Sequence, residues 1–325
     1  MVYLFRVNNS SLRRMEEIRF KQIVKVGCGL DVHQHLIVAS IRKSDDEVET
    51  REFTAYTSSL TSLRDWCKQE GVTHVVMEST VVYWKPVFNV LEEDFEILLV
   101  NARHVKNVPG HKTDPKDSRW LSKLLLSGLL KGSFIPPRDI RELRDLVRYR
   151  KKVIAQAAAD KNRIIKTLEN GNIKLSSVLS NVDGSTGTKI IDKMIEGVTD
   201  IDELMKFYHG KIKVDKSEFR LALEGHLTAH HRLMLQILKD SIADKERQIK
   251  RLDAEIEKAS KAYQVEIDLL QTIPGVGKES AITIISETGV DMDKFPDEHH
   301  LSSWSGMSPG NNESGGKKNG SNSSR

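Results

Sequence analysis

The sequence predicts an α/β protein in which a mixed sheet is followed by long helices. Between residue 24 and about residue 130, short apolar runs alternate with amphipathic stretches, which is typical of strands and helices in turn. Beyond Pro136 and Pro137 the apolar spacing becomes that of helices alone. The 325 residues are enough for two domains, and 30% charged with 38% hydrophobic residues excludes a fibre or a wholly disordered chain.

The predicted elements of the first part follow one another closely. Three strands are expected at residues 24–32, 35–43 and 48–56, with SDDE as the polar turn between the last two. They are followed by a helix at 58–71, a strand at 72–80, a helix at 83–95, a strand at 96–102 and a helix at 114–130. The order βββαβαβα, with an antiparallel start and a parallel second half, is that of an RNase H-like sheet.

Four acids occur in an ordered series at the edges of these elements: Asp31, Glu78, Asp114 and Asp117. Each has an ordinary explanation by itself, since Asp114 precedes a proline as a helix N-cap and Asp117 suits the first helical turn. Together they fall where an RNase H-like sheet assembles a metal site. Two Mg²⁺ ions about 4 Å apart could hold a phosphodiester there, so the sequence predicts metal-dependent cleavage of nucleic-acid strands.

A long basic helix is predicted at residues 138–170. It carries ten Lys or Arg between Arg138 and Lys166 against four acids, together with an apolar stripe. A solvated face is the alternative, but this surplus favours nucleic-acid contact that weakens with salt. The residues expected to make this contact are Arg141, Arg144, Arg148, Arg150, Lys151 and Lys152.

A second long helix is predicted at residues 216–262. Leu235, Ile242, Ile249 and Ile256 recur every seven residues, and Lys245 interrupts the second apolar row three positions on. This pattern is compatible with pairing to the basic helix inside one chain and with a coiled coil between two chains.

The C-terminal part contains a glycine turn between two apolar helical segments. The sequence PGVGK resembles a helix-hairpin-helix, in which the amides around Gly275 and Gly277 would hold a DNA phosphate and Lys278 would add charge. A plain helix connection is the alternative. Farther on, Ser314 lies in ESGGKK, within a Ser/Gly/Asn-rich segment whose composition indicates a disordered tail.

These motifs in this order are similar to those of the DEDD transposases of the insertion-sequence family numbered one hundred and ten. The resemblance covers roughly residues 24–320 and is carried by GLDVH, MESTVVYW, KTDPKDSRWL, TIPGVGKESAITIISETG and WSGMSPGNNESGGKK. It implies a RuvC-like nuclease domain at 24–135 after an N-terminal extension at 1–23. A helical, coiled-coil region at 136–265 and a small transposase domain at 266–325 would follow.

The resemblance also implies a chemistry and partners. Asp31, Glu78, Asp114 and Asp117 would bind two Mg²⁺ ions, and Ser314 would attack DNA and form a 5′-phosphoserine intermediate. Members of the family recombine donor and target DNA under the guidance of a structured RNA, and they act as homodimers or higher oligomers. A prokaryotic cytoplasmic protein associated with the nucleoid is expected, because the N-terminus lacks a signal peptide and no apolar run reaches membrane-spanning length.

One departure from the family and two rival functions remain open. Family members continue past the serine motif with a basic helical stretch, whereas this sequence ends at Arg325, so a C-terminally truncated member with doubtful activity is expected. The first rival is an RNase H-like junction nuclease that uses water. The second is a truncated, inactive remnant that only binds nucleic acid.

Overall fold

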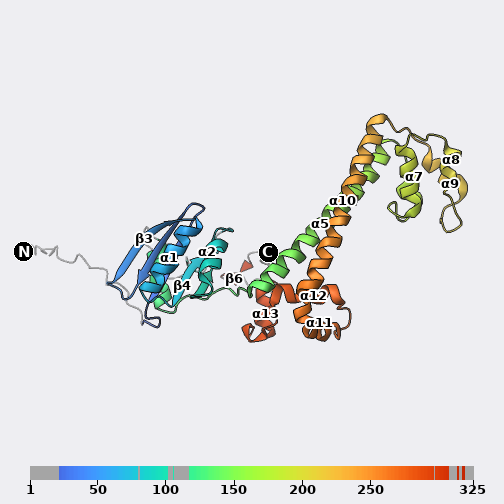
Figure 1. Ribbon diagram of the computed structural model, residues 1–325. Coiled ribbons are helices and arrows are strands. Elements are labelled where there is room, and N and C mark those ends of the chain that lie inside the picture. The colour runs from blue at the N-terminus through green and yellow to red at the C-terminus, as the bar shows by residue number, and fades with distance from the viewer. Residues whose placement is uncertain are drawn as a thin grey trace, which may run out of the picture. The chain divides into compact units, whose positions relative to one another are not determined.

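The computed structural model describes residues 22–79, 81–101, 105, 117–295 and 297–306, together with the backbone of 313–314 and 317–318. The chain divides into two compact units, residues 1–135 and 136–325, and each is described by itself (Figure 1). Asp114 and the proposed N-terminal extension up to residue 21 lie outside the described residues. Within the described part of the chain, no helix is long and apolar enough to cross a membrane.

The first unit is built on a five-stranded sheet with the strand order β3-β2-β1-β4-β5. The strands are β1 (Gly27–Val32), β2 (Leu36–Arg42), β3 (Val48–Thr54), β4 (His74–Glu78) and β5 (Glu96–Val100). The pairs β1–β2 and β2–β3 are antiparallel, whereas β1–β4 and β4–β5 are parallel. The predicted mixed sheet and α/β class are therefore confirmed, and the topology is consistent with an RNase H-like domain.

Three of the helices that the structure describes in this unit cover the two faces of the sheet. They are α1 (Thr57–Gln69), α2 (Trp84–Leu91) and α4 (Asp117–Leu126). Side chains on one face, such as Leu30 and Met77, share a core with α1 and α2. On the opposite face, Val76 packs with Leu121 and Leu124 of α4. Alternate residues of β1 and β4 therefore point to different helices, as strand geometry requires.

Helix α4 lies unusually close to β1 because two glycines face it. A Cβ atom added at Gly29 would be 2.2 Å from the carbonyl oxygen of Ser118 and 2.5 Å from the amide nitrogen of Ser122. At Gly27 an added Cβ would meet only the ends of the Leu125 and Leu126 side chains. Backbone thus packs directly on backbone at Gly29, where no other residue fits without moving the helix.

The substitution Gly29→Ala should therefore lower the free energy of unfolding by at least about 1–3 kcal/mol, the usual cost of overpacking. The control Gly132→Ala should cost little, because its nearest atom would be Leu98 Cγ at 3.6 Å. Urea unfolding followed by tryptophan fluorescence measures both, since Trp66, Trp84 and Trp120 lie in this unit. Equal stability of the two variants would contradict the close approach of α4.

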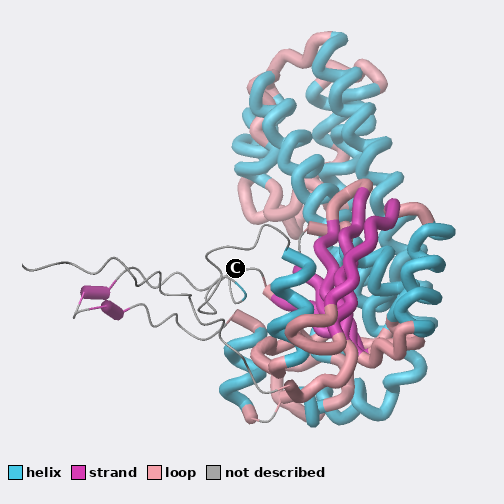
Figure 2. Tube along the Cα trace, turned by 90° about the vertical axis from the view of Figure 1, so that its left-hand side faces the viewer, coloured by secondary structure: helices cyan, strands magenta, loops and turns pink. Residues whose placement is uncertain are grey.

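The second unit is organised around two long antiparallel helices, α5 (Arg138–Asn170) and α10 (Ala229–Ser260). They lie side by side in Figures 1 and 2 and contact each other along their length. Contacts from Asn170 to His231 at one end and from Arg150 to Asp253 at the other fix the antiparallel direction. The apolar stripe of α10, including Leu235, packs inside the chain, which is the first of the two predicted alternatives.

The prediction of one helix over 216–262 is wrong, because residues 224–228 are not helical and separate two helices. Helix α9 (Lys216–Leu223) ends there, and α10 begins after the N-cap Thr228. At Gly225 an added Cβ would lie 2.5 Å from the carbonyl oxygen of Gly171, which also accepts a hydrogen bond from the His226 amide at 2.7 Å. This tertiary contact overrides the helix propensity of residues 224–228, and the local sequence pattern does not predict it.

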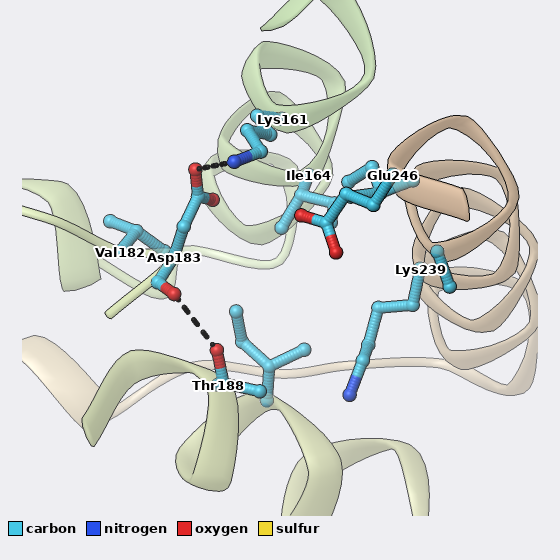
Figure 3. A pocket seen from close by; sticks show the side chains of 10 residues that line it. Lys161, Ile164, Val182, Asp183, Thr188, Lys239 and Glu246 are labelled. Atoms are coloured by element: carbon cyan, nitrogen blue, oxygen red, sulfur yellow. Dashed lines mark hydrogen bonds and ion pairs between the residues drawn. The ribbon is translucent and has the colours of Figure 1, made fainter. Parts of the chain in front are cut away.

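Short helices occupy the stretch before α9. They are α6 (Leu175–Val178), α7 (Ser185–Ile195) and α8 (Ile201–Met205), and with α9 they form a core against one end of the α5–α10 pair. A cavity of 270 Å³ lies between α5, α7 and α10, and Figure 3 shows the side chains that line it. Lys161 pairs with Asp183 at 3.1 Å beside it, and burial lowers the pKa of Lys239, which contacts Asp192.

The C-terminal elements follow α10. They comprise η1 (Lys261–Tyr263), α11 (Gln264–Gln271), α12 (Lys278–Thr288), η2 (Met292–Lys294), α13 (Glu298–Trp304) and the short strands β6 (Glu313–Ser314) and β7 (Lys317–Lys318). Helices α11 and α12 share a core with the N-terminal end of α5 and the C-terminal end of α10, where Leu143, Ile256 and Ile285 are buried.

The lysine that interrupts the heptad has a partner on α5. Lys245 Nζ donates to Asp160 Oδ2 at 2.7 Å, and the Ser241 hydroxyl and Arg163 also bond this carboxylate. Asp160 is only 4% exposed. The hydrogen bond from Lys245 is the main reason that the pKa of Asp160 lies below its ordinary value.

The substitution Asp160→Asn should lower the free energy of unfolding at pH 7 by about 3 kcal/mol, because it leaves Lys245 without its charge partner. Since the folded-state pKa is depressed, this stabilisation is complete above the ordinary carboxyl pKa of about 3.9 and is lost as pH falls through the folded value. Denaturant unfolding followed by circular dichroism between pH 7 and pH 3 measures the effect.

In that experiment the variant should lose less stability on acidification than the unsubstituted chain. Asp240→Asn is the matched control, because Asp240 is exposed on α10 and accepts a hydrogen bond from the neutral Gln236. Parallel acid profiles of the Asp160 variant and the unsubstituted chain would contradict the assignment.

Candidate acid edge and nucleic-acid interface

Two of the four predicted acids lie side by side at one edge of the sheet. The parallel register of β1 and β4 pairs Leu30 with Met77, and the next residues along the two strands are Asp31 and Glu78. Neighbouring strands are about 4.8 Å apart. Asp31 follows Gly29 and Glu78 follows Val76 by two residues, so both acids belong to the face that α4 covers.

Helix α4 delivers the third acid to the same edge. Its Ser118 lies over Gly29 and its Leu125 over Gly27, so the helix runs antiparallel to β1. The N-terminus of α4 therefore points toward the carboxyl end of β1, where Asp31 stands. Asp117 is the first residue of this helix. We call Asp31, Glu78 and Asp117 the acid edge.

The donor set of the acid edge suits a hard divalent cation, because carboxylate oxygens are what Mg²⁺ binds. Residues 22–79, 81–101, 105, 117–295 and 297–306 contain no group of three or more His, Cys, Asp or Glu close enough to hold a metal. The fourth predicted ligand, Asp114, lies outside these residues. The fold thus places three acids at one edge of one face without closing a complete ligand set around a cation.

A histidine of the GLDVH motif, His33, contacts the acid edge. The Nε2 of exposed His33 is 3.1 Å from Asp31 Oδ2. His33 lies in the turn after β1, where its amide donates to the carbonyl of Leu36 at 2.9 Å. The hydrogen bond engages one oxygen of Asp31. In GLDVH, Asp31 and His33 are two residues apart, which is the only sign of this contact in the sequence. The alternation of strand residues does not predict the turn that follows β1.

The loop that follows Glu78 contains backbone strain. Val81 has φ +50°, a left-handed conformation that β-branched residues rarely adopt. Its side chain is 69% exposed, and that of Val82 is 56% exposed. Such a residue costs about 1–2 kcal/mol. Strain of this kind is concentrated at functional sites, and here it lies three residues beyond the acid edge.

Replacing Val81 with glycine should relieve that strain. Val81→Gly should leave the unfolding free energy unchanged or raise it by up to about 1 kcal/mol, since glycine also costs chain entropy. Val82→Gly, at a neighbour with ordinary φ, should lower the free energy by about 1 kcal/mol. Thermal unfolding of the two variants compares them directly, and a greater loss for Val81→Gly would refute the left-handed backbone.

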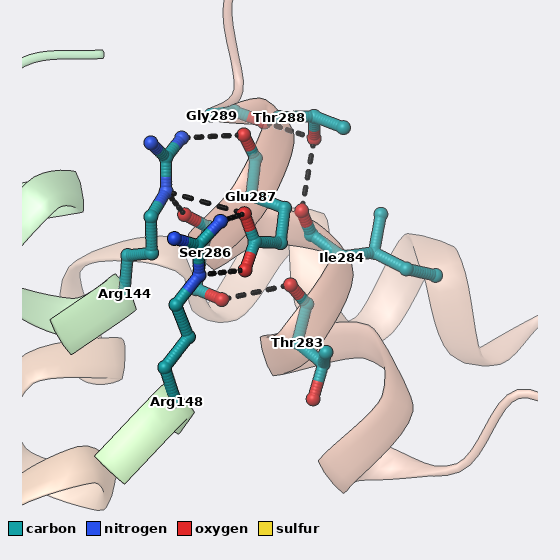
Figure 4. A network of polar contacts seen from close by, with 8 residues as sticks. All are labelled: Arg144, Arg148, Thr283, Ile284, Ser286, Glu287, Thr288 and Gly289. Atoms are coloured by element: carbon teal, nitrogen blue, oxygen red, sulfur yellow. Dashed lines mark hydrogen bonds and ion pairs between the residues drawn. The ribbon is translucent and has the colours of Figure 1, made fainter. Parts of the chain in front are cut away.

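Several arginines predicted to contact nucleic acid hold α12 against α5 (Figure 4). Arg144 donates to the backbone carbonyls of Ser286 and Glu287 at 2.9 and 2.6 Å, at the C-terminal end of α12 where cations are favoured. Arg148 forms two bonds of 2.7 Å to the Glu287 carboxylate. Burial lowers the pKa of Arg144, and the Glu287 carboxylate raises the pKa of Arg148.

The other predicted basic residues differ in their surroundings. Arg150 bonds Asp253 of α10 and Glu279 at the start of α12. Arg141 donates to the carbonyl of Pro136 at 3.1 Å. Lys151 and Lys152 are exposed. The basic surplus of α5 therefore serves internal ion pairs in part. The acid partners of Arg148 and Arg150, Glu287 and Asp253, lie more than 100 residues away in the sequence.

The structure brings the glycine turn and the basic helix to one groove. Gly275, with φ +88°, allows the turn, and Gly277 is the N-cap of α12. A Cβ at either glycine would meet open space. A groove of 990 Å³ between α5, α10 and α12 is lined by the predicted residues Arg148, Arg150, Lys151 and Lys278 and by Asp253, Glu257, Glu279 and Glu287.

Ser314 lies in a regular backbone segment of the second unit. It belongs to β6, where it pairs with Lys317 of β7 in a two-stranded antiparallel ladder. Figure 2 draws these strands as two short magenta segments. Composition alone indicated a disordered tail, and the short ladder differs from that expectation. Only its backbone is described.

Comparison with known proteins agrees with this architecture. Residues 28–173 match the DEDD transposase model of the IS110 family, described as a transposase. Residues 267–325 match the model described as the transposase IS116/IS110/IS902 family. The first match includes the sheet from the second residue of β1 onward and all of α5. The second begins within α11 and covers α12 and the segment with Ser314. No curated protein matches the chain.

Proposed function

We propose that this DNA transposase, with IS110-family transposase domains in both of its units, recombines donor and target DNA for a mobile element through a metal-dependent serine reaction. The observation that carries the proposal is the placement of Asp31 and Glu78 at adjacent carboxyl ends of β1 and β4, on the face that α4 covers. RNase H-like nucleases hold phosphodiesters at an edge of this kind, and the topology is consistent with that fold.

The acid edge would hold the cations together with Asp114. When bound, two Mg²⁺ ions would polarise the scissile phosphate and stabilise charge on the attacking and leaving oxygens. The chain's own contribution is to present several carboxylates at one place. Carboxylate oxygens are the ligands that a hard divalent cation prefers. His33 would keep the Asp31 carboxylate in one orientation.

Ser314 would be the nucleophile. Its Oγ would form a bond to the scissile phosphorus while the bond to the 3′ oxygen breaks, and the hydroxyl proton would pass to the departing 3′ oxygen. The products are a 5′-phosphoserine and a free 3′ hydroxyl. Attack by the 3′ hydroxyl of another strand would reverse these changes and release the serine, so the phosphoester is conserved for rejoining.

Nucleic acid would be held mainly through its phosphates. The amides after Gly277 and the cation of Lys278 suit a phosphate in the manner of a helix-hairpin-helix, and Lys151 and Lys152 extend the charge along α5. Arg148 and Arg150 could contribute when phosphate displaces their carboxylates. A guide RNA would read the DNA sequence by base pairing, and a homodimer or higher oligomer would unite donor and target.

The test uses the full chain, labelled donor and target DNA, and RNA transcribed from the DNA that flanks the reading frame. With Mg²⁺, the unsubstituted protein should form a DNA adduct that survives denaturing electrophoresis. Ser314→Ala should abolish the adduct, whereas Ser303→Ala, at an exposed serine of α13, should retain it. Asp31→Asn should abolish cleavage and adduct together, because it removes a charged ligand.

The rival functions give different results in the same assay. Cleavage without an adduct, unchanged by Ser314→Ala, would overturn the serine assignment and favour a junction nuclease that uses water. Salt-dependent binding that Asp31→Ala leaves unaltered, with no cleavage at any Mg²⁺ concentration, would overturn the catalytic proposal and favour an inactive binding protein.

A further inference from the structure

A chain of hydroxyl groups ties the first turn of α4 to strands β2 and β3. Ser118 Oγ lies 2.9 Å from Ser40 Oγ, which in turn lies 2.9 Å from Thr50 Oγ1. Arg119 Nε donates to the same Thr50 oxygen at 3.0 Å. The hydrogen bonds therefore run from Ser118 of α4 across β2 and β3 and end at Arg119, the next residue of α4. We call these four residues the polar seam.

Two residues of the polar seam are buried where α4 packs against the sheet. Ser40 and Ser118 are fully buried, and the neighbouring contacts of α4 with the sheet are made by Leu121 and Leu124. A buried hydrogen bond adds only about 1 kcal/mol of net stability. Apolar residues at these positions could supply comparable stability, so stability alone does not explain hydroxyl groups here.

Hydrogen bonds differ from apolar contacts in having direction. Apolar burial is non-directional and tolerates rotation of a helix on its sheet. A shift of one residue turns an α-helix by about 100°. Such a turn would carry Asp117 away from the face of Asp31 and Glu78, although the leucines of α4 could still be covered. Hydrogen bonds from two consecutive residues, Ser118 and Arg119, oppose this rotation directly.

We propose that Ser40, Thr50, Ser118 and Arg119 are positioning residues that fix the rotation of α4 and hold Asp117 at the acid edge before any cation binds. The inference rests on the proposed cation binding at that edge. None of the four residues touches the cations in this proposal. They act through α4, as groups behind metal ligands commonly do.

The chain offers an internal control one turn farther along α4. Ser122 is also fully buried, and its hydroxyl accepts from Arg42 Nε at 3.2 Å and donates to the carbonyl of Arg119 at 2.8 Å. It lies beyond the polar seam and five residues from Asp117. Its bond to Arg42 of β2 also restrains α4, but at a point farther from Asp117. Loss of the Ser122 hydroxyl should therefore affect stability about as much as loss of the Ser118 hydroxyl, and the direction of Asp117 less.

The test measures Mn²⁺ binding to the full chain without nucleic acid, by calorimetry and by electron paramagnetic resonance. Thr50→Val and Ser118→Ala should each weaken Mn²⁺ binding about tenfold or more, the usual effect of removing support behind a ligand. Ser122→Ala should change it less than about twofold. Thermal unfolding without cations records whether each variant is folded. If Thr50→Val or Ser118→Ala does not fold, Arg119→Gln is measured in its place.

The outcomes separate this inference from the proposed function. If Asp31→Asn leaves Mn²⁺ binding unchanged, the acid edge is not a cation site and both proposals fail. If Asp31→Asn abolishes binding but Thr50→Val and Ser118→Ala bind as the unsubstituted chain does, the positioning role alone is overturned. Equal weakening by Ser122→Ala would likewise overturn it, because the effect would then reflect general loosening of α4.

Discussion

The structure of the candidate site depends on the close packing of α4 against β1. Gly29 removes the side chain that would separate the helix backbone from the strand, and the carbonyl of Ser118 occupies that space. Because α4 runs antiparallel to β1, this single contact also sets which end of the helix reaches the carboxyl edge of the sheet. An acid at the first position of α4 then comes to the same edge of the sheet as the acids at the ends of two parallel strands. The placement of Asp117 thus follows from a glycine on another element.

Much of the first unit could be predicted because its strands and helices are specified locally. Alternation of apolar residues located all five strands, and the acids could be ordered along the sheet from strand ends alone. The polar seam could not be predicted, since Ser40 and Ser118 are 78 residues apart and each is an unremarkable serine in sequence. The supporting contacts of the site and the placement of Asp117 therefore required the tertiary fold, whereas the positions of Asp31 and Glu78 at strand ends required only secondary structure.

In the second unit, too, some features could be predicted from the sequence and others required the tertiary fold. A surplus of positive charge along α5 predicted nucleic-acid contact, yet Arg144 and Arg148 bond the end of α12. Charge counted along one helix cannot distinguish a surface for phosphate from a set of internal partners, because Coulomb attraction does not depend on sequence distance. Lys245 is the converse case. It breaks the apolar heptad of α10 and is explained only by Asp160 on the partner helix.

Two kinds of interaction therefore have different tasks in this protein. Apolar burial on both faces of the sheet and between α5 and α10 supplies most of the stability, but the hydrophobic effect has no direction of its own. Buried polar contacts at a few points supply direction: the polar seam for α4, Asp160 with Lys245 for the long pair, and the arginines for α12. A reaction at a phosphodiester tolerates misplacement of only about 1 Å. Direction at these points therefore matters more for function than the energy of each contact.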